Sequence, residues 1–258
     1  MTQQKTVIGV DVGGTKIHAG LYRAGDLVML GEKQVGTPGG GDFEDVLYEA
    51  VQLVHDLRGG DTSGVGVGFP GYINGKTGML YKTPNLPLKE PMNVREYLRG
   101  KIGLPVAVEN DAKLFTLAEY ETNWKGKVKN LVGLTLGTGL GSGLILNGEL
   151  FRGKDGFAGE FAHTAFDYHH EFEDFVSGKG NREELGVYLG VLLSNIIHIF
   201  NPEAIVLGGS VSRDFSRIKG QVLAEVRTRT VPQSLEGLLI ETAQLEHAGS
   251  VGAAMLAL

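Results

Sequence analysis

Two segments of this chain, Val7–Gly14 and Leu131–Thr138, share one pattern: an apolar run followed directly by a turn that begins with glycine. Each is followed by a second apolar run and by a polar turn with a leucine after it. This order is typical of a buried strand, a tight hairpin and a second strand. Its recurrence predicts two related lobes, although two unrelated glycine-rich hairpins would show the same pattern.

The rest of the chain alternates short apolar runs with amphipathic stretches, which indicates an α/β fold. We expect further strands at residues 17–22, 65–67, 106–108 and 204–207. Helices are predicted over residues 43–54 with Asp42 as N-cap, over 111–124, over 183–200 before Asn201-Pro202, and over 250–258.

Composition excludes several classes of protein. The 258 residues carry a net charge of -6 and no long basic block, which argues against a nucleic-acid partner. There is no cysteine, so disulfides and thiolate metal sites are impossible. No apolar stretch reaches the roughly 18–20 residues that span a bilayer, and no signal peptide fits the short polar start. We therefore expect a cytoplasmic protein without a membrane partner.

The first glycine turn is a candidate phosphate site. Gly13 and Gly14 would let backbone N–H groups approach an anion, and Thr15 and Lys16 could add a hydroxyl and a cation. Asp11 would repel phosphate unless a cation lay between them, so the motif implies Mg²⁺ held by Asp11, through water. The alternative is a plain hairpin with a solvated aspartate.

A second candidate follows the other strand, where Gly137, Thr138 and Gly139 begin a run of four alternating glycines. That number exceeds what a hairpin needs. Gly208-Gly209-Ser210, after the strand at 204–207, is a third turn suited to close contact with a nucleotide.

The residues Gly66, Gly68 and Gly71 spell G-x-G-x-x-G after a strand. Pro70 lies inside the motif, and Asn74-Gly75 follows it as a turn. A dinucleotide-binding fold needs a helix N-terminus at that point, so we reject this interpretation.

Two groups of polar residues are candidates for acid–base chemistry and substrate binding. Asn110 and Asp111 lie at a strand-to-helix junction, where they could cap the helix or bind a hydroxyl and accept its proton. Glu160 and His163 are three residues apart and could face one ligand. The acidic, histidine-rich run at 169–174 could hold a metal, but a solvated loop is the expected state.

Taken in order, these motifs resemble the ROK family of bacterial sugar kinases. The matching pieces are Asp11–Lys16, Gly68–Gly71, Pro84–Leu86, Glu109–Ala112, Gly137–Gly143, Glu160-x-x-His163, Ser177-Gly178, Asn201–Glu203 and Gly208-Gly209. The resemblance implies two actin-like (ribonuclease H-like) lobes with a cleft between them, one built from residues 1–112 and 246–258 and the other from 113–245.

The resemblance also implies roles for individual residues. Asp111 would be the general base. Sugar hydroxyls would be held by Asn85, Asn110, Glu160, His163 and Glu173. Nucleotide and Mg²⁺ would be bound by Asp11, Gly13, Gly14, Thr15, Lys16, Gly137, Thr138, Gly139 and Gly209.

The chain departs from the family in the segment after His163. The family usually carries a cysteine-rich zinc loop there, and this chain has only residues 164–172. We therefore expect a protein without zinc. We predict instead that Phe166, Phe172 and Phe175 pack as an apolar brace, with Glu160, His163 and Glu173 directed at one sugar.

The function implied is phosphorylation of a hexose hydroxyl, expected at O6, with ATP and Mg²⁺. Three alternatives stay open: a sugar-binding regulatory protein without turnover, a kinase with polyphosphate as donor, and an actin-like filament protein. The partners would be a hexose and a nucleotide, and the resemblance allows for a homodimer.

Overall fold

The computed structural model describes residues 5–176 and 184–258. The chain forms two compact units. Unit 1 contains Met1–Ala118, Gly153–Phe157 and Glu246–Leu258, and unit 2 contains Glu119–Arg152 and Ala158–Leu245. The domain boundaries expected from the sequence stay a prediction. Ser177-Gly178 and Glu183 lie outside the described residues.

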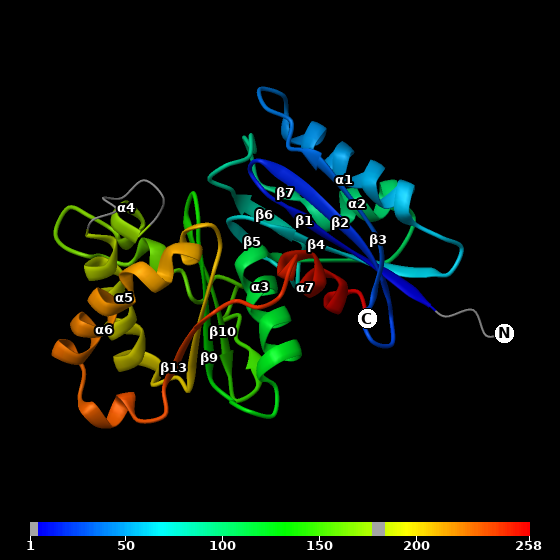
Figure 1. Cartoon of the computed structure of the whole chain (residues 1–258). Helices are drawn as coiled ribbons and strands as arrows, with labels where there is room; N and C mark the ends of the chain where they lie inside the picture. Colours follow the sequence, from blue (N-terminus) through cyan, green and yellow to red (C-terminus); the bar gives the residue numbers. More distant parts are fainter. Residues whose placement is uncertain (1–4, 177–183) are drawn as a thin grey trace. The chain divides into compact units, whose positions relative to one another are not determined.

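Unit 1 is built on a five-stranded sheet of order β3-β2-β1-β4-β8 (Figure 1). The strands are β1 (Thr6–Val12), β2 (Lys16–Arg23), β3 (Met29–Gly36), β4 (Thr62–Phe69) and β8 (Val106–Asn110). The pairs β1–β2 and β2–β3 are antiparallel, and β1–β4 and β4–β8 are parallel. A smaller sheet in this unit consists of β5 (Tyr72–Asn74), β6 (Met79–Lys82) and β7 (Met92–Asn93).

Unit 2 repeats this topology, as the duplicated motif predicts. Its sheet has the order β11-β10-β9-β12-β13, with antiparallel pairs β9–β10 and β10–β11 and parallel pairs β9–β12 and β12–β13. The strands are β9 (Leu131–Leu136), β10 (Leu140–Leu146), β11 (Glu149–Leu150), β12 (Ala204–Gly208) and β13 (Leu239–Thr242). Each glycine motif therefore lies in the first hairpin of its own sheet.

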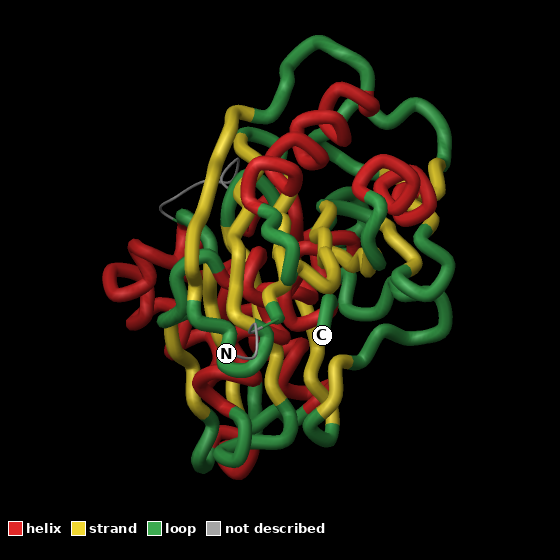
Figure 2. The backbone as a smooth tube through the Cα atoms, turned by 90° about the vertical axis from the view of Figure 1, so that its right-hand side faces the viewer, coloured by secondary structure: helices red, strands yellow, loops and turns green. Residues whose placement is uncertain are grey.

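Helices cover these sheets. In unit 1, α1 (Phe43–Leu57) and α2 (Val94–Ile102) pack on one face of the sheet, and α7 (Ala248–Leu256) packs on the other (Figures 1 and 2). In unit 2, α5 (Leu185–Phe200) and α6 (Phe215–Arg229) pack against one another, and the short α4 (Phe172–Val176) contacts α5. The single-turn elements are η1 (Tyr120–Trp124), η2 (Phe161–His163), η3 (Val211–Asp214) and η4 (Pro232–Leu235).

Successive side chains of β1 and β4 point to opposite faces of the first sheet, and this alternation explains how the two faces differ. Ile8 and Val10 belong to the core that α1 completes, whereas Gly9 faces α7. A Cβ at Gly9 or at Gly66 would overlap backbone atoms of α7. These glycines therefore let a helix lie directly on the strands, which is the role of Gly66 in the rejected G-x-G-x-x-G pattern.

Several helix boundaries differ from those predicted. Asp42 precedes α1 as expected, and its N–H donates to Asp45 Oδ2 at 2.9 Å. The helix predicted to end at Trp124 is α3 (Asp111–Glu119) followed by the π-helical turn η1. The last helix begins at Ala248 and not at Ser250. Helices α2 and α6 and strands β3 and β13 were not predicted. Helix α6 and the two strands expose much of their surface, whereas α2 is short but buries Val94, Leu98 and Ile102 at a regular helical spacing.

No helix within the described ranges is long and apolar enough to cross a membrane.

The packing of α7 predicts the effect of an added methyl group. Gly66→Ala should lower the free energy of unfolding by at least about 1–3 kcal/mol, because the new Cβ would meet the rigid backbone at Ala253. Gly100→Ala is the matched control, since nothing lies within 4 Å of that position on α2, and it should raise stability by about 0.5–1 kcal/mol. Urea denaturation of both variants tests this, and equal midpoints would contradict the predicted contact.

Candidate active site

The first glycine turn connects β1 to β2 in unit 1. The Gly13 N–H donates to the Lys16 carbonyl at 2.9 Å, and the Thr37 hydroxyl donates to the Gly13 carbonyl at 2.6 Å. A Cβ at Gly14 would lie 2.8 Å from the Cβ of Asn85, so this position needs glycine for Asn85 to pack beside the turn. The structure thus brings a predicted sugar ligand next to the predicted phosphate turn.

Asp11 lies near the end of β1, immediately before this turn. The backbone of α7 approaches it so closely that a Cβ at Gly249 would overlap its carboxylate. The pKa of Asp11 is raised from 3.8 to about 7, chiefly by burial and also by the negative charge of Asp111, while Lys16 partly opposes the shift. No sequence signal pointed to Gly249, because its contact with Asp11 joins opposite ends of the chain.

Asn110 and Asp111 lie where β8 passes into α3. The Asn110 Oδ1 accepts the Lys113 N–H at 3.0 Å, and its Nδ2 donates to the Gly71 carbonyl at 3.1 Å. Asn110 is therefore the residue that caps α3 and ties it to Gly71. The Asp111 Oδ1 accepts the N–H of Ala112 at 2.8 Å. Asp111 is half-buried at the N-terminus of α3.

The second glycine turn connects β9 to β10 in unit 2. The Gly137 N–H donates to the Gly139 carbonyl at 2.9 Å. Gly209 has a φ of 83°, and a Cβ there would overlap the backbone of Leu136 at the end of β9. The predicted nucleotide residues Gly137, Thr138, Gly139 and Gly209 are thus neighbours within unit 2.

Glu173 contacts the second glycine turn, which the sequence did not indicate. Its Oε2 accepts the N–H of Leu140 at 2.7 Å, and a Cβ at Gly139 would lie 2.9 Å from its Oε1. The carboxylate therefore rests on the second glycine turn and uses one of the N–H groups that this turn offers. Its predicted contact with sugar stays a prediction.

Glu160 and His163 lie at the two ends of the turn η2. His163 is about half exposed, with its side chain 46% accessible, and its Nδ1 lies 2.8 Å from Glu171 Oε2. The chain then turns back, because the Phe172 N–H donates to the Thr164 carbonyl at 3.2 Å and Ala165 pairs with Glu171. This return places α4, with Glu173, in contact with η2.

Aromatic contacts support this returning segment, as predicted. The Phe166 ring lies 5.4 Å from that of Phe172 and 4.8 Å from that of Phe175, between ring centroids. Tyr188 of α5 completes the group and stacks on Phe175 at 4.4 Å. Such aromatic pairs contribute about 0.5–1.5 kcal/mol each beyond their burial. Tyr188 was missed, because it belongs to a different helix and only the tertiary fold places it here.

The histidines of this segment have separate partners. His163 pairs with Glu171, and the Nδ1 of His170 lies 2.9 Å from Asp167 Oδ1. Among the residues that the structure describes, the one group with three potential metal ligands at close range is His18, Glu32 and His247 in unit 1. The run at 169–174 is accordingly a largely exposed segment and not a gathered metal centre.

Comparison with known proteins gives one family. The model of the ROK family matches residues 7–182 and 177–258. The N-acetyl-D-glucosamine kinase of Pectobacterium atrosepticum is 31% identical, with 96% of this chain and 97% of that protein covered. The glucokinase of Halalkalibacterium halodurans is 27% identical, with 96% and 94% covered.

Solved structures agree in fold. A ROK family glucokinase from Streptomyces griseus, in complex with glucose and AMPPNP, has a TM-score of 0.83 and 26% identity over 98% of this chain and 99% of that one. An inorganic polyphosphate/ATP-glucomannokinase from Arthrobacter sp. strain KM has a TM-score of 0.78 and 28% identity over 97% of both chains.

The raised pKa of Asp11 predicts how stability changes with pH. Its folded-state pKa of about 7 lies above the ordinary value of 3.8, so the folded protein binds more protons than the unfolded chain between these values. The free energy of unfolding should therefore fall as pH rises through this window. Asp11→Asn removes the titration. The measurement is the urea midpoint of both proteins from about pH 5 to about pH 8, in buffer with EDTA. The wild type should lose stability relative to the variant as pH rises. A difference between the two midpoints that stays constant with pH would contradict the raised pKa of Asp11.

Proposed function

Because this chain belongs to the ROK family and is a sugar kinase, we propose that it transfers the terminal phosphoryl group of ATP to a hexose hydroxyl, at O6. The observation that carries the proposal is the pair of carboxylates in unit 1. Asp111 at the start of α3 and Asp11 at the end of β1 are close enough to raise the pKa of Asp11. Beside them lies an exposed glycine turn with a lysine.

Asp111 is the proposed general base. It is the first residue of α3, and the Asn110 cap fixes the start of that helix. Phosphoryl transfer has a loose transition state, so the protein acts chiefly by positioning groups and by neutralising charge. Asp111 would orient the attacking hydroxyl and accept its proton.

The residues around Asp11 suit a magnesium ion. Mg²⁺ prefers oxygen ligands, and Asp11 offers a carboxylate next to that of Asp111 in surroundings that disfavour two uncompensated charges. When bound, Mg²⁺ would neutralise negative charge on the donor phosphates. Asp11 would hold it through water, while Gly13, Gly14, Thr15 and Lys16 bind phosphate oxygens.

The second glycine turn supports nucleotide binding in unit 2. Gly137, Thr138 and Gly139 form a tight turn. Because Gly209 has no side chain, its backbone lies directly against that of Leu136, next to this turn. Backbone N–H groups in such turns bind anions. Glu173 competes for one of them through its bond to the Leu140 N–H. We infer that Glu173 releases this donor when it turns to a sugar hydroxyl.

The sugar ligands proposed are Asn85, Asn110, Glu160, His163 and Glu173. Amide, carboxylate and imidazole groups all form hydrogen bonds with hydroxyls. Similar proteins are named as N-acetyl-D-glucosamine kinase, glucokinase and beta-glucoside kinase, and these substrates share a glucose-type ring. That shared ring supports a hexose of this class as the acceptor.

The phosphoryl donor has two candidates. ATP is supported by the glucokinase relative solved with AMPPNP. Inorganic polyphosphate is the second, because the similar glucomannokinase is named for both donors. Both present a chain of phosphates to the glycine turns.

A substrate panel tests the function directly. Purified protein is incubated with Mg²⁺, with ATP or polyphosphate, and with glucose, N-acetylglucosamine, mannose, fructose or N-acetylmannosamine. We expect a sugar 6-phosphate from at least one of the glucose-type sugars, identified by ³¹P NMR. Tight sugar binding without any product would support the regulatory alternative, and hydrolysis of ATP without sugar phosphate would support the filament alternative. Size-exclusion chromatography of the same sample tests the expected homodimer.

The role of Asp111 predicts a specific kinetic defect. Asp111→Asn should lower kcat by about 10²–10⁴-fold while sugar affinity changes little, since the amide keeps the shape but cannot accept the proton. Asp56→Asn on α1 is the control, because that exposed residue pairs with Lys33 outside the site. Steady-state kinetics on both variants provide the measurement. An undiminished kcat in Asp111→Asn would remove this residue from the mechanism.

A further inference from the structure

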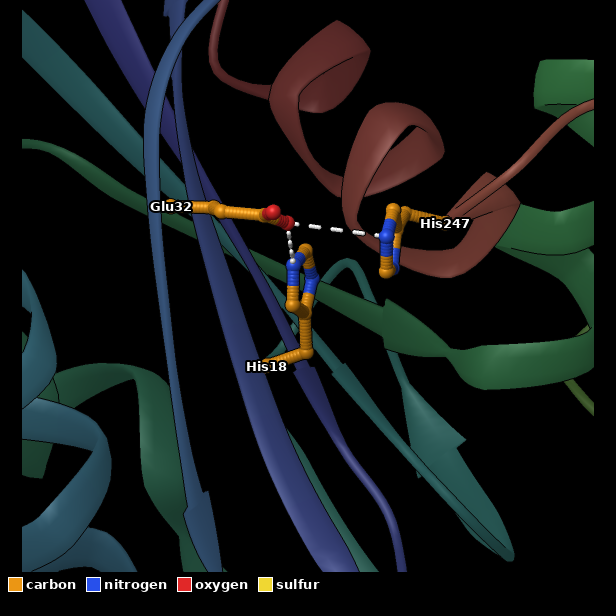
Figure 3. A group of neighbouring side chains, drawn as sticks. All are labelled: His18, Glu32 and His247. Atoms are coloured by element: carbon orange, nitrogen blue, oxygen red, sulfur yellow. Dashed lines mark hydrogen bonds and ion pairs between the residues drawn. The ribbon is translucent and has the colours of Figure 1, made fainter.

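Three side chains with metal-binding atoms meet in unit 1 outside the proposed active site. His18 lies on β2, Glu32 on β3, and His247 immediately before α7 (Figure 3). Strand pairing places Glu32 opposite Gly20, so Glu32 and His18 share one face of the sheet. The three residues are far apart in sequence, and the return of α7 to this sheet brings them together.

One of the two ligand distances suits coordination of one ion, and the other is that of a direct contact, which an ion would lengthen. The Nε2 of His18 lies 2.8 Å from Glu32 Oε2, and the Nε2 of His247 lies 3.5 Å from the same oxygen. Zinc bonds of about 2.0–2.2 Å in tetrahedral geometry require ligand atoms to be about 3.3–3.5 Å apart. Two imidazoles and one carboxylate form a ligand set typical of Zn²⁺.

The hydrogen bonds of Ser250 determine which nitrogen of His18 carries a proton. Its hydroxyl lies 3.0 Å from His18 Nδ1, 2.8 Å from the Tyr22 hydroxyl and 3.0 Å from the His247 carbonyl. A hydroxyl donates once and accepts twice, and a carbonyl can only accept. All three bonds form together only when Ser250 donates to His247 and accepts from Tyr22 and from Nδ1–H of His18.

This arrangement leaves Nε2 of His18 facing a carboxylate oxygen. With the proton on Nδ1, the Nε2 of a neutral ring presents a lone pair to Glu32 at 2.8 Å, which is repulsive. The contact becomes favourable only when a positive charge, a second proton or a metal ion, lies between the two atoms. A ring whose Nδ1–H is held by a neighbouring group, with Nε2 facing outward, is the usual state of a metal-binding histidine.

The backbone of His247 also indicates a positioned side chain. Its φ of 53° lies in the left-handed region, which a residue other than glycine adopts only at a cost. The conformation places the His247 ring over that of His18, with centroids 4.1 Å apart. The side chains of Glu32 and His247 are 50% and 33% exposed, so an ion can enter from solvent.

We propose that His18, Glu32 and His247 bind one Zn²⁺ ion, with water as the fourth ligand. The ion fastens the start of α7 to the outer strands β2 and β3. Its role is structural, because the ion binds neither Asp11 nor Asp111, although His18 lies opposite Asp11 in the β1–β2 pair. The proposal revises the expectation of no zinc, which rested on the loop after His163, where a chain without cysteine cannot form a cysteine-bound site.

Ion entry requires two adjustments. The two imidazole planes are 10° from parallel, and a ligating nitrogen must direct its lone pair at the metal within its ring plane. His18 is buried and held by Ser250, so the ring of His247 turns. The Glu32 carboxylate, which lies beside both rings, moves back from His18 Nε2 to make room for the ion (Figure 3).

Metal binding is tested on the full chain after treatment with EDTA. Zn²⁺ is titrated by calorimetry, and Co²⁺ is added as a probe with visible absorption. We expect one ion per chain and a melting temperature several degrees higher with Zn²⁺. Glu32→Gln and His247→Gly should each weaken binding more than about 100-fold, beyond the loss expected for a residue that only orients a ligand. Glycine at position 247 suits the positive φ, so this variant should keep its fold.

The control is the double variant His169→Gln/His170→Gln, which removes two exposed histidines of unit 2 and should bind Zn²⁺ like the wild type. Kinase activity with Mg²⁺ should be retained in Glu32→Gln. Absence of Zn²⁺ binding would overturn the proposal. Two other binding results would also overturn it: Zn²⁺ binding that Glu32→Gln and His247→Gly both keep, or Zn²⁺ binding that the double variant loses. The same holds if ¹⁵N NMR shows both nitrogens of His18 protonated in the presence of excess Zn²⁺.

Discussion

The close contact between α7 and the strands β1 and β4 is the constraint on which unit 1 depends. Glycines at positions 9 and 66 remove the side chains that would otherwise separate helix and sheet. The backbone of α7 therefore lies directly on the strands, and Gly252 in turn lets it approach Leu114 of α3. One face of the sheet is packed in this way, while larger aliphatic side chains fill the other face under α1.

The electrostatics of the candidate site follow from this packing. Asp11 stands at the end of β1 because the strand places it there, and Gly249 of α7 closes over its carboxylate. Burial and the charge of Asp111 then raise its pKa to a value near neutrality. A carboxylate in this state favours a bound cation, which supports the magnesium site proposed at Asp11.

The segment after His163 shows how a chain without cysteine can hold a loop. Where the family usually has a zinc loop, this chain has a turn closed by backbone pairing and by a group of aromatic rings. The rings come from residues near in sequence and from α5. The same segment carries Glu173, whose carboxylate rests on the second glycine turn. Aromatic packing thus helps to hold the segment that places the Glu173 carboxylate on this turn.

The sequence by itself determined the local features: both glycine turns, the Asp42 start of α1, and the Asn110-Asp111 junction between β8 and α3. These depend on apolar periodicity, glycine conformation and capping, which act over a few residues. The tertiary structure alone decided that Gly249 covers Asp11, that Glu173 reaches Leu140, and that His247 joins His18. Each of these contacts depends on the path of the whole chain, because local propensities carry no information about which distant segments meet.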